Sequence, residues 1–200
     1  MESKPYDVVL LPEERVARKA IEVSAALAKH GTRFTLDGLT HYPHISLYML
    51  QLADLPSALE ELRAIAAERP GIYASAHHYR YSHEYLSVEY AKTGAATLLQ
   101  DETVRRLNPL RDGLRKKDAA RLATVTGLER HNILTYGYRS IGDSFSPHLT
   151  FTRFSSPNED IVETLPDMDE FSGMYPRLGI LEMGNHGTCI RLVDSWDLPA

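Results

Sequence analysis

The same five-residue pattern occurs twice in this chain, and each copy places a hydroxyl side chain two positions after a histidine. Residues 43–47 are Pro-His-Ile-Ser-Leu, and residues 147–151 are Pro-His-Leu-Thr-Phe. An imidazole can remove or deliver a proton near neutral pH. A hydroxyl can donate a hydrogen bond to the charge that builds up on a phosphate in a transition state. The two copies together would therefore be equipped for acid/base chemistry on a phosphate.

The spacing within each copy favours a β-strand that presents its polar side chains on one face. Successive side chains of a strand point to opposite faces, so His44 shares a face with Ser46, and His148 shares a face with Thr150. The apolar residues between and after them would then point into a core. Two such strands side by side would present two imidazoles and two hydroxyls to one cleft.

These four side chains match the needs of cyclic phosphodiester hydrolysis. One group must take a proton from water and another must deliver a proton to the departing ribose oxygen. We predict that His44 and His148 are this acid/base pair and that Ser46 and Thr150 bind the phosphate. The sequence does not assign which histidine is the base.

The remaining sequence predicts an α+β fold with largely antiparallel sheets, because strands and helices interleave and hairpin signals recur. The repeated motif indicates an internal duplication with one sheet per copy, within a single domain over residues 1–200. We expect strands over 6–11, 33–36, 44–52, 133–138 and 146–154, two paired strands within 72–90, and a hairpin of 178–183 with 188–198. We expect helices over 12–31, 55–67, 95–107, 108–123 and 157–165.

Composition limits the classes of partner. The formal charge is −5, and proteins that coat long nucleic acid need a surplus of Lys and Arg for phosphate contacts. No apolar run approaches the ~18 residues that span a membrane. The single cysteine excludes an intrachain disulfide and a thiolate metal cluster. We expect a cytoplasmic monomer that takes a small phosphorylated ligand or a chain end, with no membrane partner.

The paired His-x-Ser/Thr motifs, one in each half of a chain of about this length, resemble those of the 2H phosphoesterase superfamily. Its members include bacterial 2′-5′ RNA ligase-like proteins and cyclic nucleotide phosphodiesterases. The resemblance implies a bilobed, pseudo-twofold fold of two intertwined lobes, with two antiparallel sheets flanking a central cleft and helices outside. It implies that the two motifs face each other, that no metal or other cofactor is obligatory, and that the substrate is a 2′,3′-cyclic phosphate of a nucleotide or RNA end. Weak 2′-5′ ligation and a role in RNA processing are also implied.

Two further residues are weaker candidates for substrate binding. Tyr48 continues the face of His44 and Ser46, so its ring could stack on a base. Arg153 follows the second motif, where relatives often carry a basic residue. Strict alternation places Arg153 on the face opposite His148, so it reaches the cleft only through a bulge or its long side chain.

Other interpretations of the sequence lead to different functions. The same cleft could serve a non-catalytic nucleotide-binding module, although binding alone would tolerate loss of the proton-transfer groups. A metal site is disfavoured because the histidine spacing fits no helical zinc pattern and no carboxylate is placed as third ligand. Residues 111–121 are basic but interrupted by acids, which favours a solvated face. Cys189 is predicted to be a small buried residue. The histidines weighed as metal ligands are His41, His44, His77, His78, His83 and His131.

Overall fold

The computed structural model describes residues 3–200, apart from the side chain of His186, as an α+β fold. The strands are β1 (Lys4–Leu11), β2 (Ile45–Leu52), β3 (Ile72–Ala74), β4 (Ala76–Ser82), β5 (Tyr85–Tyr90), β6 (His148–Arg153), β7 (Gly173–Tyr175), β8 (Arg177–Met183) and β9 (Cys189–Asp197). The α-helices are α1 (Glu14–Leu27), α2 (Leu55–Glu68), α3 (Gly94–Leu107), α4 (Lys116–Arg121) and α5 (Gly127–Tyr136). Short 3-10 turns lie between them.

Each copy of the repeated motif belongs to a different antiparallel sheet. The larger sheet has the order β2-β1-β8-β9, and a second sheet has the order β4-β5-β6. A short ribbon of β3 and β7 stands apart from both, and every named strand pair is antiparallel. The motif strands β2 and β6 are edge strands that contact each other across the two sheets. The predicted fold class, with one sheet per motif, is confirmed.

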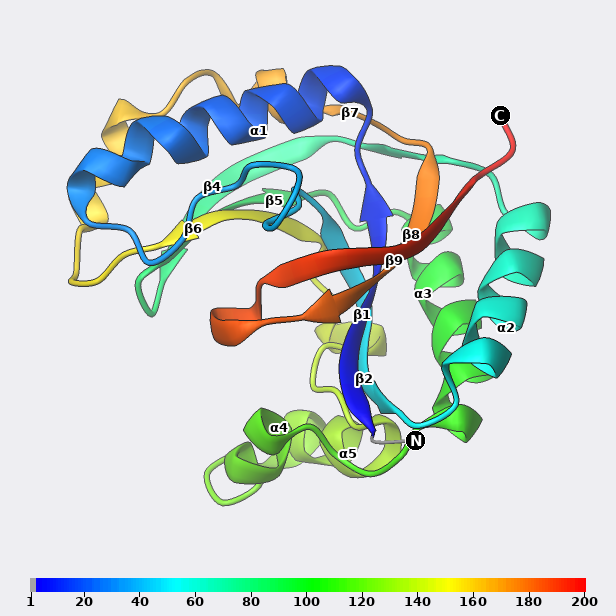
Figure 1. Ribbon diagram of the computed structural model, residues 1–200. Coiled ribbons are helices and arrows are strands. Elements are labelled where there is room, and N and C mark those ends of the chain that lie inside the picture. Colours follow the sequence, from blue (N-terminus) through cyan, green and yellow to red (C-terminus); the bar gives the residue numbers. More distant parts are fainter. Residues whose placement is uncertain (1–2) are drawn as a thin grey trace.

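The helices cover the outer faces of the two sheets (Figure 1). Helix α1 packs on β6, whereas α2 packs on β8 and β9 and α3 packs on β2. Helices α4 and α5 lie together at one end of the molecule (Figure 1). No helix within residues 3–200 combines the length and the apolar character that crossing a bilayer requires.

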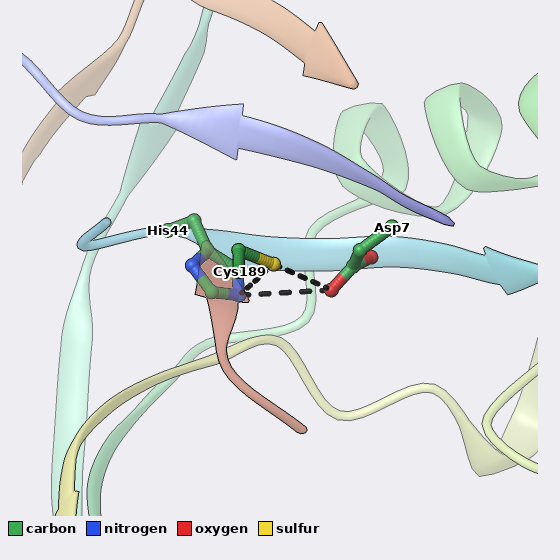
Figure 2. A group of neighbouring side chains, drawn as sticks. All are labelled: Asp7, His44 and Cys189. Atoms are coloured by element: carbon green, nitrogen blue, oxygen red, sulfur yellow. Dashed lines mark hydrogen bonds and ion pairs between the residues drawn. The ribbon is translucent and has the colours of Figure 1, made fainter. Parts of the chain in front are cut away.

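Strand β1 separates the main core from the face that carries the motifs. It pairs with β2 and β8 along its two edges, and its residues 6–11 are buried on both faces. Val8 joins the large core beneath the helices, whereas Val9 packs in a small cluster with Cys189. Asp7 lies on this second face and points toward His44 and Cys189 (Figure 2).

Helix α1 follows its sequence pattern. Its buried residues recur at helical spacing and form the stripe that packs on the core. Ser24 lies in this stripe, where its hydroxyl donates to the carbonyl of Phe151 on β6 and accepts from the amide of Leu36. One buried side chain therefore joins the helix, the second motif strand and the segment before the first motif.

Several expected elements differ in the structure. The pattern of residues 133–138 predicts a strand, but α5 extends to Tyr136, and Gly137 ends it with a left-handed φ of 73°. Asn132 explains the helix, because its buried amide donates to the carbonyls of Arg139 and Ile141 and folds the following segment back.

The expected strand over 33–36 is irregular. The expected helix over 108–123 contains only a 3-10 turn and α4, and the helix expected over 157–165 is a 3-10 turn.

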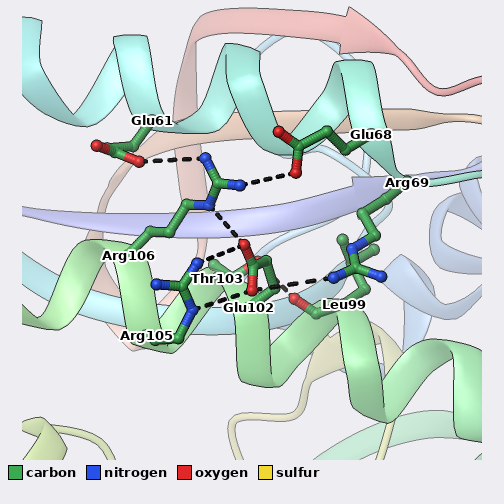
Figure 3. Close-up of polar contacts among 8 residues, drawn as sticks. All are labelled: Glu61, Glu68, Arg69, Leu99, Glu102, Thr103, Arg105 and Arg106. Atoms are coloured by element: carbon green, nitrogen blue, oxygen red, sulfur yellow. Dashed lines mark hydrogen bonds and ion pairs between the residues drawn. The ribbon is translucent and has the colours of Figure 1, made fainter.

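A network of ion pairs joins α2 to α3 on the outside of the larger sheet (Figure 3). Glu102 on α3 accepts from Arg105 at 2.7 Å and from Arg106 at 2.6 Å. Arg106 also reaches Glu68 on α2 at 2.8 Å. These hydrogen bonds hold the pKa of Glu102 at about 2, well below its usual value. The network therefore fastens α2 to α3.

We expect the Glu102→Gln substitution to lower the free energy of unfolding at neutral pH by roughly 1 kcal/mol, the upper range for a partly exposed ion pair. The folded-state pKa lies below the unfolded value of 4.5. The stabilisation is therefore present above pH 4.5 and is lost as the pH falls toward 2. Urea unfolding across this range measures it, with the exposed Glu60→Gln as matched control. A difference between wild type and Glu102→Gln that stays constant down to pH 2 would contradict this role.

Candidate active site

A cleft between the two sheets brings all four motif side chains together. His44 and Ser46 from the first motif and His148 and Thr150 from the second line the same cavity, which encloses about 470 Å³ including its open mouth. The sequence pattern therefore corresponds to one site in space. The other lining residues are Phe34, Leu36, His41, Tyr42, Met49, Tyr85, Gly187, Thr188 and Cys189.

The two histidines are held in the same way. Nδ1 of His44 lies 2.6 Å from the carbonyl oxygen of Tyr42, and Nδ1 of His148 lies 2.8 Å from the carbonyl oxygen of Ser146. A carbonyl only accepts, so each Nδ1 carries the proton and donates it. In the neutral imidazole this leaves the lone pair on Nε2. Both rings therefore offer Nε2 for proton transfer.

The proline before each histidine explains why the arrangement repeats. Pro43 and Pro147 stand between each histidine and the carbonyl that holds it. A proline fixes φ and biases the preceding residue toward extended backbone, so the direction of that carbonyl is set locally. His148 is the first residue of β6. The sequence pattern predicts that His44 also lies within a strand, but His44 directly precedes β2.

Burial keeps both imidazoles neutral in the free protein. Desolvation lowers the pKa of His44 from 6.5 to about 4, against the opposing effect of the Tyr42 carbonyl, and the charge of His148 lowers it further. Desolvation also lowers the pKa of His148, although the Ser146 carbonyl and the Glu89 carboxylate oppose it. An anion that enters the cleft would therefore favour the charged form of an imidazole.

The two hydroxyls differ in their partners. The Ser46 hydroxyl donates to Oδ2 of Asp7 at 2.6 Å. The Thr150 hydroxyl makes no hydrogen bond within the described part of the chain and lines the open cleft. Thr150 is therefore ready to donate to a ligand. Ser46 can donate to a ligand only after its hydrogen bond to Asp7 breaks.

Asp7 is a site residue that the sequence analysis missed. Its side chain is fully buried on β1, and burial raises its pKa to about 7 although the Ser46 hydroxyl and the Arg115 charge oppose this. Its Oδ2 lies 3.6 Å from Nε2 of His44. The available signal was an acidic residue in the otherwise apolar strand Tyr6-Asp7-Val8-Val9, because a buried charge is costly unless it is used.

Cys189 is buried, as predicted, but it also lies at the site. Its Sγ is 3.7 Å from Nε2 of His44 and 3.7 Å from Oδ2 of Asp7. The expectation that no carboxylate could complete a metal ligand set is corrected here, because Asp7, His44 and Cys189 converge from three separate strands or strand ends (Figure 2). The sequence distance between these three residues concealed the cluster.

Tyr48 does not reach the cleft, contrary to expectation. The register of β1 against β2 shifts between Val8, which pairs with Tyr48, and Val9, which pairs with Ser46. The bulge breaks the alternation, so Tyr48 is fully buried and its hydroxyl donates to the carbonyl of Tyr136 at 2.6 Å. Tyr48 therefore supports the strand and is not available to stack on a substrate base.

Arg153 lies beside the cleft rather than in its lining. Its guanidinium is 3.1 Å from the carboxylate of Glu84 and 5.0 Å from the ring centroid of Tyr85, and Tyr85 does line the cleft.

The basic stretch that follows α3 is only partly a solvated face. Arg115 is 7% exposed and pairs with Asp118, and Nζ of Lys117 lies 5.9 Å from the ring centroid of Tyr85. Two cations, those of Arg153 and Lys117, therefore support one aromatic wall of the cleft.

Comparison with known proteins identifies the fold. No protein-family model and no curated protein matches this sequence. Among solved structures, Escherichia coli LigT in its apo form matches with a TM-score of 0.58 at 14% identity, covering all of both chains. The protein TT0787 of Thermus thermophilus matches with a TM-score of 0.58 at 13% identity, covering 97% of each chain. A structure described as a phosphoesterase matches with a TM-score of 0.57 at 14% identity, covering all of both chains.

At sequence identities this low, the likeness to these solved structures shows the fold alone. The paired motifs lie on two antiparallel sheets that meet at one cleft, which is the arrangement that the resemblance to the 2H phosphoesterase superfamily implied. The chain therefore has the LigT-like fold, in agreement with the superfamily that its motifs resemble.

Proposed function

We propose that this protein is a phosphoric diester hydrolase that opens 2′,3′-cyclic phosphates, of nucleotides or of RNA ends, to phosphomonoesters by a two-histidine mechanism that needs no metal. The observation that carries the proposal is the convergence of His44 and His148, each with Nδ1 fixed and Nε2 available, in one cleft with the Thr150 hydroxyl. The likeness of fold to LigT and to a phosphoesterase supports it.

The mechanism divides the proton transfers between the two rings. One neutral imidazole takes a proton from water through Nε2, and the water oxygen attacks phosphorus. The bond from phosphorus to one ribose oxygen breaks, and the other histidine, protonated, delivers its Nε2 proton to that oxygen. Thr150 donates to a non-bridging oxygen as charge builds up there. When the 5′-hydroxyl of a second RNA end takes the place of water, its oxygen attacks phosphorus and the bond from phosphorus to the 3′-oxygen breaks. The same two histidines serve these proton transfers, so weak 2′-5′ ligation is part of the proposal.

The cleft also offers surfaces for the base of a nucleotide. Phe34 and His41 stack with ring centroids 5.7 Å apart and nearly parallel planes, and both line the cleft. Tyr42 and Tyr85 contribute two more rings. Stacking on aromatic rings tolerates any base. We therefore place a nucleoside or an RNA end beside the phosphate site, and LigT, which has been crystallised with 3′-AMP and with phosphate, offers a parallel.

We expect His44→Ala and His148→Ala each to reduce hydrolysis of 2′,3′-cyclic nucleotides by roughly 10²–10⁴-fold, because each removes one proton-transfer group. The exposed His131→Ala serves as matched control and should retain wild-type rates. Rates are measured on cyclic nucleotides and on short oligoribonucleotides with cyclic ends, with circular dichroism to verify folding. Folded variants as active as wild type would refute the assignment. Tight mononucleotide binding without turnover of any cyclic phosphate would establish a non-catalytic binding module instead.

We expect Thr150→Val to lower kcat by roughly 10²-fold, because it removes a transition-state donor while preserving side-chain shape. Thr150→Ser keeps the hydroxyl and should restore most of the activity. Steady-state kinetics of the two variants on one cyclic nucleotide measure the effect. Full activity in Thr150→Val together with a loss in Thr150→Ser would show that packing by the threonine methyl group, rather than hydrogen bonding, is what matters.

The pH dependence follows from the lowered histidine pKa values. Catalysis needs one imidazole neutral and one protonated, and this state is most populated between the two free-protein pKa values. The pKa of His44 is about 4, and that of His148 lies below 6.5. We therefore expect kcat/KM to be highest at acidic pH and to fall as the pH rises toward neutrality. An optimum well above pH 7 would contradict it.

A further inference from the structure

Three different potential metal ligands converge beside the proposed catalytic centre. Oδ2 of Asp7 and Nε2 of His44 are 3.6 Å apart, and Sγ of Cys189 lies 3.7 Å from each of them. A tetrahedral zinc ion with ordinary bond lengths separates such ligand atoms by about 3.3–3.6 Å. The triangle of ligand atoms, drawn in Figure 2, is therefore nearly as large as one face of a zinc site.

The partners of these residues already hold them in a ligating geometry. The Nδ1–H of His44 donates to the Tyr42 carbonyl, which directs the Nε2 lone pair into the triangle. The Ser46 hydroxyl donates to Oδ2 of Asp7 and fixes the carboxylate. Metal-ligating histidines and carboxylates in proteins are oriented by hydrogen bonds of this kind. The supporting contacts of a metal site are thus present.

The charge balance of the cluster also favours a cation. Asp7 is fully buried, its Oδ1 has no hydrogen-bond partner, and its only ion-pair partner among residues 3–200 is His44. A buried carboxylate without a cation is costly. A divalent ion bound to the Asp7 carboxylate and the Cys189 thiolate would leave no net charge. This is an independent reason to place a cation at the triangle.

The ligand types select the kind of metal. Sulfur and imidazole nitrogen suit zinc and similar transition metals, whereas magnesium and calcium prefer oxygen alone. His44 and Cys189 line the cleft, so a fourth coordination position would open toward the substrate. Binding at this position would also use the lone pair of Nε2 of His44, which the proposed hydrolysis needs.

We propose that Asp7, His44 and Cys189 bind a zinc-class divalent cation, and that the bound cation switches off hydrolysis by occupying Nε2 of His44. Binding displaces the thiol proton of Cys189, and the proton of any Asp7 carboxyl that carries one, to solvent, and no electron is transferred. The binding half of the proposal stands on the geometry alone, whereas the regulatory half rests on the proposed hydrolysis.

Cobalt(II) titration of chelator-treated protein tests binding without any assay of turnover. Cys189 is the only cysteine in the chain, so a thiolate-to-cobalt charge-transfer band must arise from it. We expect the band to saturate at one equivalent and to disappear when zinc is added. Cys189→Ser should abolish it, and Asp7→Asn and His44→Ala should weaken cobalt affinity at least tenfold. His148→Ala should keep the band, because His148 is not a ligand.

Absence of the band in wild type would overturn the binding proposal. A band of unchanged affinity in both Asp7→Asn and His44→Ala would do so as well, because it would show capture by the thiol alone. Retention of the band in His148→Ala, whose hydrolysis we expect to be lost, keeps this result separate from the fate of the proposed function.

The regulatory half is tested by cyclic-nucleotide hydrolysis with one equivalent of zinc and then with excess chelator. We expect wild-type hydrolysis to fall at least tenfold with zinc and to recover with chelator. In Cys189→Ser the ratio of rates with and without zinc should stay near one. Hydrolysis that is unaffected or stimulated by bound zinc would overturn the switch. A wild type that binds cobalt but hydrolyses no cyclic phosphate would refute the proposed function and leave the metal site standing.

Discussion

In both motifs a histidine donates its Nδ1–H to the carbonyl two residues before it, across an intervening proline. The contact is entirely local, so each half of the chain builds it without reference to the other half. It fixes the tautomer and directs Nε2 away from the backbone. The rest of the site depends on this constraint, because an imidazole that turned around its χ angles would present neither a defined base nor a defined ligand.

The fold places the two histidine motifs opposite each other. It does so by giving each motif an edge strand in its own antiparallel sheet and by packing β2 against β6. Buried polar side chains such as Ser24 tie the second motif strand to segments near the first. The two halves are nevertheless unequal: Ser46 is engaged by the buried Asp7, whereas Thr150 faces the cleft without a partner among the described residues.

Strand periodicity was enough to predict the four motif side chains in one cleft, because the pattern and the pairing of two similar halves carry that information. It failed at Tyr48, since a bulge between β1 and β2 moves that residue to the buried face. It also failed at residues 133–138, where the Asn132 amide stabilises a helix that the apolar pattern does not distinguish from a strand. The sequence does not predict that Asp7 and Cys189 lie at the site, for a different reason. Neither residue is unusual in its own segment, and only the sheet order β2-β1-β8-β9 brings them to His44.

We propose that the two motifs form a single phosphate site. A crystal structure of the protein with bound inorganic phosphate, obtained at acidic pH, is the measurement that decides it. We expect one phosphate ion within hydrogen-bond distance of Nε2 of both His44 and His148 and of the Thr150 hydroxyl. A phosphate bound to one histidine alone, or bound elsewhere while the cleft stays empty, would contradict it.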